Sequence, residues 1–322
     1  MKQHQFEVDN APLWQEIAAI LDGSEQDRRA LPVLYRRLCQ CLALCRQRGY
    51  SPAIADYLQK MVSDCHRQLY GAAVKRPNTL LRWMLVDFPC RVREEWALLL
   101  VAVLAVFGVG LAIGLLVWFN PQLAYSFMSP DDLASARQMY QPSSVKIGRG
   151  GSAGDMQMFG LYIWNNISIG FRSFAAGIFG GIPALLSLAF NGMHVGVIGA
   201  WLSKDPATRT TFWSFVITHS SFEITGLVLS GMAGMKMGLA LIHPGRLSRG
   251  HAVHAASEKM FPVIVGAALM IFLAAFFEAF WSASSAIPVS VKYGVGALCW
   301  TLVIVFFAFA GRGAQSGPTH AN

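Results

Sequence analysis

Residues 97–119 read ALLLVAVLAVFGVGLAIGLLVWF, a run of 23 residues that contains no charged side chain. An α-helix rises about 1.5 Å per residue, so this run can cross the roughly 30 Å hydrocarbon core of a bilayer. Arg91 and Arg93 precede the run, and an excess of basic residues marks the cytoplasmic side of a membrane. The stretch therefore predicts a membrane-spanning helix whose amino-terminal end faces the cytoplasm.

The chain of 322 residues is polar before this run and apolar after it. Only 14% of all residues are charged, whereas soluble domains carry about a quarter. The first 96 residues hold 14 of the 26 Lys and Arg and 11 of the 18 Asp and Glu. We therefore expect a cytoplasmic head over residues 1–76 and a membrane bundle over residues 97–310. The net charge of +8 is thinly spread, which favours attraction to anionic lipid over nucleic-acid binding.

The head has the start and stop signals of helices. We expect helices from Asn10 to about Leu21, from Asp27 to about Arg48, and from Ser51-Pro52 to Gly71. Five of the six cysteines lie in the first 96 residues, namely Cys39, Cys41, Cys45, Cys65 and Cys90. Their C-x-C-x3-C spacing lacks the paired arrangement of zinc sites, so we expect small buried thiols. Residues 77–96 mix apolar and basic side chains, which predicts an amphipathic helix along the cytoplasmic leaflet.

The body contains further apolar segments after the first run. These predicted spans are residues 157–180, 183–202, 211–242, 261–281 and 288–310. Gly180-Gly181-Ile182-Pro183 divides a run that is too long for one crossing, because Pro disfavours helix at the residue before it. Residues 120–155 are expected as an outer polar loop, residues 243–260, which include Lys259, as an inner loop, and residues 311–322 as a disordered tail.

The predicted fold class is thus an all-α, polytopic membrane bundle of about six crossings with an N-terminal cytoplasmic helical domain. Both termini would lie inside a bacterial inner membrane, and the lipid bilayer would be its first partner. No signal peptide is expected, because the first 30 residues include acidic side chains and lack an apolar core.

Several polar side chains fall inside the predicted spans, where an ionisable group is costly. His219 and Glu223 are four residues apart and therefore share one face of a helix. Six crossings bring Glu278, Asn165 and Asn166 to a similar depth on the same side. We therefore expect a polar cavity, open to the outer side and lined by these five side chains.

Two basic side chains within the spans have simpler explanations. Arg172 is a sixth cavity candidate, which we expect to snorkel to the interface or to pair with Glu223 or Glu278. Lys236 stands among glycines and is expected to snorkel toward the inner side. Gly234 and Gly238 have the G-x-x-x-G spacing that lets helices approach closely.

A set of short motifs follows in a fixed order along the body. They are Asn165-Asn166, Gly180-Gly181-Ile182-Pro183, Asn191-Gly192 with Gly196, His219-Ser220-Ser221-Phe222-Glu223, the glycines to Gly238, and Glu278. Together they resemble the stage II sporulation protein M family over roughly residues 90–310. Ser220 stands where the family pattern His-Gly-x-x-Glu has its Gly. The resemblance implies a membrane scaffold, with cell-envelope proteins or a MoxR-type ATPase as partners, and it does not carry over the role in sporulation.

Three functions are compatible with these features. The first is a scaffold or subunit of a cell-envelope membrane complex, with a homo-oligomer as a further option. The second is a transporter or channel-like protein for an ion or small solute, with Glu223 as coupling site and His219 as its partner. The third is an intramembrane hydrolase that uses His219, Glu223 and Glu278 as metal ligands. H-E-x-x-H and G-x-S-x-G are absent from the sequence, so we expect no enzymatic activity, cofactor or resident metal.

Overall fold

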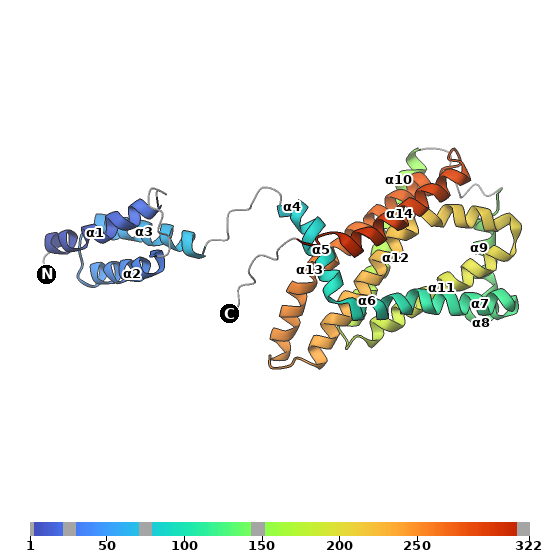
Figure 1. Ribbon diagram of the computed structural model, residues 1–322, viewed down its shortest axis with the longest axis horizontal. Helices are drawn as coiled ribbons and strands as arrows, with labels where there is room; N and C mark the ends of the chain where they lie inside the picture. Colours follow the sequence, from blue (N-terminus) through green and yellow to red (C-terminus); the bar gives the residue numbers. More distant parts are fainter. Residues whose placement is uncertain (1–2, 22–29, 71–78, 143–151, 314–322) are drawn as a thin grey trace. The chain divides into compact units, whose positions relative to one another are not determined.

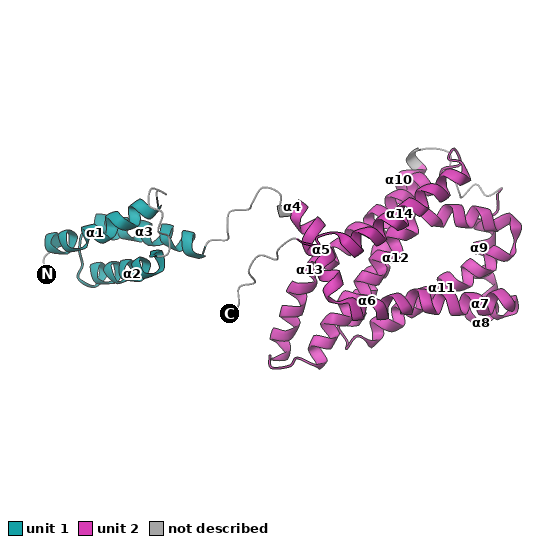
Figure 2. Cartoon of the chain, viewed as in Figure 1, with its two compact units in different colours: residues 1–79 teal, residues 80–322 magenta. Residues whose placement is uncertain are grey.

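The computed structural model describes residues 3–21, 30–70, 79–142 and 152–313, and all the regular structure in these ranges is helical. This confirms the predicted all-α class. The chain divides into two compact units, residues 1–79 and residues 80–322 (Figure 2).

The first unit is a group of three helices around its own core. They are α1 (Gln3–Leu21), α2 (Leu31–Gln47) and α3 (Pro52–Tyr70). Each helix contributes to the core, in which Ile17, Leu38 and Leu58 are fully buried. Three of the four cysteines in this unit, Cys41, Cys45 and Cys65, are buried free thiols, as expected, and Cys39 is half-buried. Burial raises the pKa of the Cys65 thiol to about 11, so this side chain behaves as a small apolar residue.

The ends of the head helices differ in part from the prediction. Helix α1 begins at Gln3, so Asn10 is not its N-cap. Asn10 is instead a residue within α1, and its side-chain Nδ2 donates to the Phe6 carbonyl oxygen at 2.8 Å. Asp27, the predicted start of the second helix, lies outside the described residues. Helix α3 begins at Pro52, which confirms the Ser51-Pro52 start signal.

The second unit is a larger helical bundle. Before its first long helix it contains α4 (Thr79–Arg82), the π-helical turn η1 (Trp83–Asp87) and α5 (Phe88–Glu94). The first long helix consists of α6 (Trp96–Val103), the π-helical turn η2 (Leu104–Gly108) and α7 (Val109–Phe119). Then come η3 (Pro121–Leu123), α8 (Ala124–Phe127) and α9 (Pro130–Met139). The remaining elements are α10 (Ser152–Gly177), α11 (Ile182–Lys204), α12 (Pro206–Ile242), α13 (Arg249–Phe276), the π-helical turn η4 (Phe277–Ser282) and α14 (Val289–Phe309).

Within the described residues, five helices are long and apolar enough to cross a membrane. They are Trp96–Phe119, Ile182–Lys204, Pro206–Ile242, Arg249–Ser282 and Val289–Phe309. The chain is therefore a multi-pass membrane protein. Helix α10 has 26 residues but is not among the five, because its polar side chains lower its mean hydropathy. The count of six crossings remains a prediction.

Helix α12 is the central element of the bundle (Figure 1). It packs against α6, α10, α11, α13, η4 and α14. In its most apolar window 67% of the residues are buried, against 22% in α14. The His219 side chain on α12 is therefore surrounded by protein, and those of Glu223 and Lys236 are mostly covered, whereas most of α14 is left for lipid.

Two glycines make the break between α10 and α11 that the sequence predicts. Gly180 and Gly181 have φ angles of +88° and +87°, which side chains with a Cβ rarely adopt. The same turn passes close to α12. A Cβ on Gly238 would lie 2.5 Å from the Gly181 backbone nitrogen, so the glycine of α12 is required for this approach.

The structure corrects several predicted boundaries in the bundle. Helix α12 runs without a break from Pro206, where the Asp205 side chain caps it by accepting from the Ala207 N–H at 2.9 Å. Helix α13 begins at Arg249, so Lys259 belongs to this helix and not to an inner loop. Ser248 provides the N-cap, a signal that lies before the apolar run and was missed.

The segment after the first long helix is more ordered than expected, and the segment before it packs differently from the prediction. The predicted loop 120–155 contains η3, α8 and α9, and Arg137 of α9 forms an ion pair with Asp205 at 2.7 Å. Residues 79–94 are helical, as predicted, and Leu80 is exposed. However, Phe88 and Val92 are buried in the bundle core, so this segment packs on the bundle as well as presenting apolar side chains outward.

Candidate functional site: a polar cluster inside the bundle

The cluster starts from two side chains of the central helix. His219 and Glu223 lie one turn apart on α12, and His219 Nε2 is 3.8 Å from Glu223 Oε2. The His219 residue is only 4% exposed, whereas about a third of the Glu223 side chain is exposed. The pair therefore has a buried imidazole and a carboxylate that is partly accessible.

The π-helical turn η4 brings a second pair of side chains to the first. A π-helix has a wider turn than an α-helix, and such turns often occur at functional sites. Glu278 and Ser282 lie on η4, and the Ser282 hydroxyl is hydrogen-bonded to His219 Nδ1 at 3.0 Å. This contact fixes the imidazole ring and leaves its Nε2 on the side of Glu223.

Helix α10 supplies the two asparagines. Asn166 Nδ2 donates to Glu278 Oε2 at 3.1 Å, and Asn165 Nδ2 donates to Asn166 Oδ1 at 2.9 Å. Asn166 is buried and Asn165 is exposed. Helix α10, helix α12 and the turn η4, which are far apart in sequence, thus meet around Glu278.

Five of the six predicted site residues are therefore in one connected cluster. One ligand atom from each of His219, Glu223 and Glu278 can be chosen so that all three lie within 4.8 Å of one another. At such distances charges interact strongly. The group can share a proton, bind a cation or coordinate a metal ion. The cavity that we expect around this cluster, open to the outer side, remains a prediction.

Arg172 does not join this cluster. Its side chain is exposed, and its Nε donates to the Ser168 carbonyl oxygen of the same helix at 3.2 Å. The expected ion pair with Glu223 or Glu278 is not formed. Arg172 lies six positions beyond Asn166, and six residues turn an α-helix to a different face.

Two further side chains next to the cluster, Ser282 and Lys292, were not predicted from the sequence. Ser282 is fully buried, and Lys292 of α14 is 6% exposed and donates from Nζ to the Ser282 carbonyl oxygen at 2.8 Å. The signal for Lys292 was present, since it is a single charge within the last apolar segment. Ser282 had no such signal, because a serine at the end of a span is common.

Tyr140 follows α9 and reaches the same region. Its ring lies edge-on to those of Phe212 and Phe215, at 5.1 and 5.9 Å, and Phe215 in turn packs on His219. Burial, together with the nearby charges of Glu278 and Glu223, raises the pKa of Tyr140 above its ordinary value. The segment expected as a loop therefore places a neutral phenol beside the carboxylates.

The order Ser282, His219, Glu223 is that of a hydrolase triad, but the geometry does not support this chemistry. The Ser282 residue is 0% exposed, so its hydroxyl cannot reach a substrate. The 3.8 Å between His219 and Glu223 also exceeds hydrogen-bond length.

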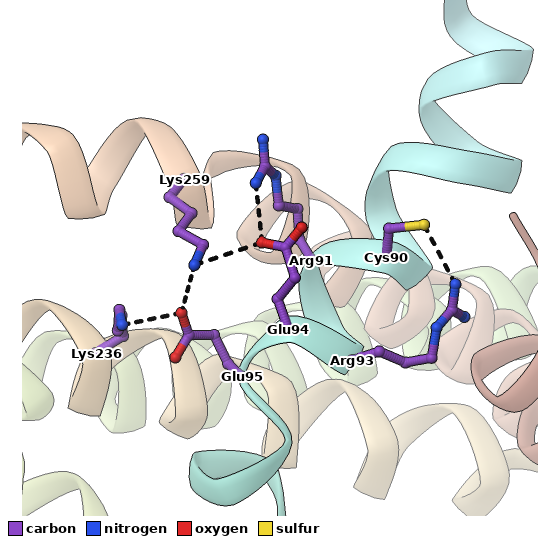
Figure 3. A network of polar contacts seen from close by, with 7 residues as sticks. All are labelled: Cys90, Arg91, Arg93, Glu94, Glu95, Lys236 and Lys259. Atoms are coloured by element: carbon purple, nitrogen blue, oxygen red, sulfur yellow. Dashed lines mark hydrogen bonds and ion pairs between the residues drawn. The ribbon is translucent and has the colours of Figure 1, made fainter. Parts of the chain in front are cut away.

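A second polar cluster joins α12 and α13 to the start of α6 (Figure 3). Glu95 is 9% exposed and pairs with Lys236 at 2.9 Å and with Lys259 at 2.8 Å. Lys236 is therefore held by an ion pair, which corrects the expectation that it snorkels. His219 and Lys236 are 17 positions apart on α12, or roughly 25 Å at 1.5 Å per residue. The two clusters thus lie toward opposite ends of the bundle.

Arg93 lies beside this second cluster and caps the carboxyl-terminal end of α14. Its guanidinium donates to the carbonyl oxygens of Phe307 and Ala310 at 2.9 and 2.7 Å. The last carbonyls of a helix lack partners within the helix, and a cation there is favourable. Arg93 therefore stabilises the bundle, apart from any contribution to membrane orientation.

A helical bundle of this kind, with ionisable side chains gathered in its interior, defines a polytopic integral membrane protein. The model of the stage II sporulation protein M family matches residues 98–283, which is more than half of the chain, and the chain belongs to this family. The predicted resemblance is confirmed, and the matched region includes Asn166, His219, Glu223 and Glu278.

Other similarities are more limited. Residues 4–71 match a domain of unknown function, DUF8413, which covers the head. An uncharacterised protein of Methanocaldococcus jannaschii is 29% identical over 79 residues, which is 24% of this chain and 44% of that protein. The match therefore spans less than half of that relative. No solved structure matches the chain.

Proposed function

We propose that this protein is a subunit of a cell-envelope complex in a bacterial inner membrane, in which the cytoplasmic head binds a protein partner and the bundle anchors it. The observation that carries this proposal is the separate head, which has its own hydrophobic core and matches its own family model. A compact unit of this kind is not needed to hold a membrane bundle together, because the bundle has a core of its own. A MoxR-type ATPase is the partner class that the family resemblance implies.

A groove on the head is the proposed contact surface. It has a volume of about 500 Å³ and is lined by residues of α1, of α3 and of the turn before α3, among them Val8, Ile54 and Tyr57. Val8 is 56% exposed and Tyr57 49%. Exposed apolar side chains beside a concave surface are a common feature of protein-binding sites.

The test compares two valines on the full-length chain. Val8 lies in the groove, while Val33 is 53% exposed on α2 and does not line it. Tagged chains carrying Val8→Glu or Val33→Glu are extracted in mild detergent after crosslinking, and cell-envelope and ATPase partners are quantified by mass spectrometry. Val8→Glu should reduce partner recovery at least about tenfold, since a charge in an apolar contact is costly, and Val33→Glu should not. Repeated recovery of the wild-type chain alone would refute the proposal.

The convergence of His219, Glu223 and Glu278 favours a second candidate function, the transport of an ion or small solute. Ionisable groups gathered inside a membrane bundle are typical of coupling sites. In liposomes, Glu223→Gln should abolish flux of a transported cation, whereas Glu258→Gln, at an exposed position of α13, should retain it. Flux that is absent in the wild type, or unchanged in Glu223→Gln, excludes this function.

A further inference from the structure

We propose that His219, Glu223 and Glu278 form a binding site for one divalent transition-metal ion, with Zn²⁺ as the ion that fits best. Their ligand atoms lie within 4.8 Å of one another, and His219 Nε2 and Glu223 Oε2 are already at 3.8 Å. Zinc bonds to nitrogen and oxygen are about 2.0–2.2 Å, so tetrahedral ligands lie roughly 3.3–3.5 Å apart. Shifts of about 1 Å in two flexible glutamate side chains would complete the arrangement.

The donor set selects the class of metal. One imidazole nitrogen and two carboxylates suit Zn²⁺ and its neighbours in the first transition row. Ca²⁺ takes six to eight oxygen ligands, and Mg²⁺ requires an octahedron of oxygens. The imidazole of His219 therefore argues against both of these hard cations.

Two side chains outside the ligand set hold it in position. Ser282 is hydrogen-bonded to His219 Nδ1 at 3.0 Å, and Asn166 donates to Glu278 Oε2 at 3.1 Å. Both residues are at least 95% buried. Metal-binding histidines and carboxylates usually have such partners, which fix the ligand orientation. A chance meeting of surface side chains would lack these buried contacts.

The charge of the cluster also fits a divalent ion. Two carboxylates and one neutral imidazole carry two negative charges, which M²⁺ cancels. A neutral cluster is what the interior of a membrane bundle accommodates at least cost. The ammonium of Lys292 donates to the Ser282 carbonyl oxygen at 2.8 Å.

Three protein ligands leave a fourth position of a tetrahedral site open. Structural zinc sites usually have four protein ligands, whereas sites that exchange or react keep one position for water or another ligand. The bound ion would therefore be exchangeable. This inference uses the same side chains as the transport hypothesis but does not require transport, because metal content is measured without flux and without a partner.

The experiment measures metal binding to the purified full-length chain in mild detergent. The protein is stripped with a chelator and reloaded with Zn²⁺, and zinc per chain is determined by elemental mass spectrometry and by competition with a chromophoric chelator. Co²⁺ serves as a spectroscopic substitute. We expect one ion per chain, a tetrahedral Co²⁺ absorption band, and affinity at least about 100-fold lower in His219→Ala and Glu278→Gln. Asn166→Ala should lose roughly 10–100-fold, as second-sphere variants do.

The chain contains a matched control for a histidine and glutamate one turn apart. His254 and Glu258 of α13 form the same i, i+4 pair at 3.4 Å, but both side chains are more than 70% exposed. His254→Ala should leave the stoichiometry and affinity unchanged. Equal loss in His254→Ala, or wild-type binding no tighter than in His219→Ala, would show surface-bound ions only and overturn the proposal. If variants misfold, a wild-type Co²⁺ spectrum without the tetrahedral band is sufficient to overturn it.

Discussion

At the scale of single residues, the ionisable side chains of the bundle obtain their partners from other helices. Glu95 shows this most clearly, because it stands between a lysine of α12 and a lysine of α13. Its burial raises its pKa, but the hydrogen bonds and charges of Lys259 and Lys236 together outweigh burial and lower the pKa below its ordinary value. One carboxylate thus holds three segments of the chain together.

We predict that Glu95→Gln destabilises the protein by roughly 1–3 kcal/mol at neutral pH. Breaking a fully buried ion pair costs about 3–5 kcal/mol, but the side chains of Lys236 and Lys259 are 30% and 34% exposed and recover part of their hydration. Thermal unfolding in detergent measures the effect. Glu94→Gln is the matched control, since Glu94 is 45% exposed and contacts Lys259 at 3.4 Å, and it should cost at most about 1 kcal/mol.

The ion pairs of Glu95 also predict how the stability of the protein depends on pH. The pKa of Glu95 is lower in the folded chain than the ordinary value of 4.5 that applies when it is unfolded. The ion pairs therefore contribute their full stability above about pH 4.5, and this contribution is lost as the pH falls through the folded pKa. The difference in melting temperature between wild type and Glu95→Gln should shrink below pH 4.5. A difference that stays constant down to pH 3 would contradict the role of this charge.

These residues also show what a sequence can and cannot predict. His219 and Glu223 were identified because an i, i+4 spacing fixes their common helix face. Glu278 and Asn166 were identified because charge and amide groups are rare in spans. The pairing of Lys236 with Glu95 was not predicted, because these residues are far apart in the chain and nothing local specifies which helices meet.

At the scale of elements, close contact between α10 and α12 depends on glycines. A Cβ on Gly234 would overlap the Phe174 backbone of α10, and one on Gly177 would overlap the Gly234 backbone. Backbone atoms cannot move aside as a flexible side chain can. The G-x-x-x-G spacing predicted such an approach, although the partner helix was not specified.

We predict that Gly234→Ala forces α10 and α12 apart and strongly lowers the yield of monodisperse protein in detergent. Gly160→Ala is the matched change, because Gly160 lies within α10 and has no atom within 4 Å of its added Cβ. It should leave the melting temperature unchanged or raise it, since Ala favours helix by up to about 1 kcal/mol. Equal behaviour of the two variants in size-exclusion chromatography and thermal unfolding would contradict the close contact.

Elements were predicted where local chemistry determines them. The α10–α11 break follows from two consecutive glycines and a proline, and α3 follows from Ser51-Pro52. Helix α9 and the turn η4 were missed. Helix α9 is too polar to show an apolar repeat, and its ion pair from Arg137 to Asp205 depends on a distant turn. A π-helical turn has no sequence signal separate from that of the helix it extends.

At the scale of the whole molecule, α10 decides the number of crossings. Its 26 residues span about 39 Å at 1.5 Å per residue, which is enough to cross a bilayer. Polar groups of α10 have hydrogen-bond partners within the bundle. Asn166 donates to Glu278, and the Ser173 and Ser187 hydroxyls lie 2.8 Å apart. A helix whose polar groups have protein partners can lie in a membrane without being strongly apolar.

We therefore predict that α10 crosses the membrane and that both termini lie in the cytoplasm. Single cysteines introduced at Gly245, between α12 and α13, and at Ser285, between η4 and α14, report the two sides. In intact spheroplasts a membrane-impermeant maleimide should label Ser285→Cys but label Gly245→Cys only after lysis, with the native cysteines replaced by serine or alanine.

A second measurement uses reporter domains fused to the amino or the carboxy terminus of the full chain. Both fusions should show cytoplasmic activity. A carboxy-terminal fusion active outside while the amino-terminal fusion is active inside would mean five crossings, with α10 on the surface. The cluster of Asn166, His219 and Glu278 would then lie at the membrane face and not within the bilayer.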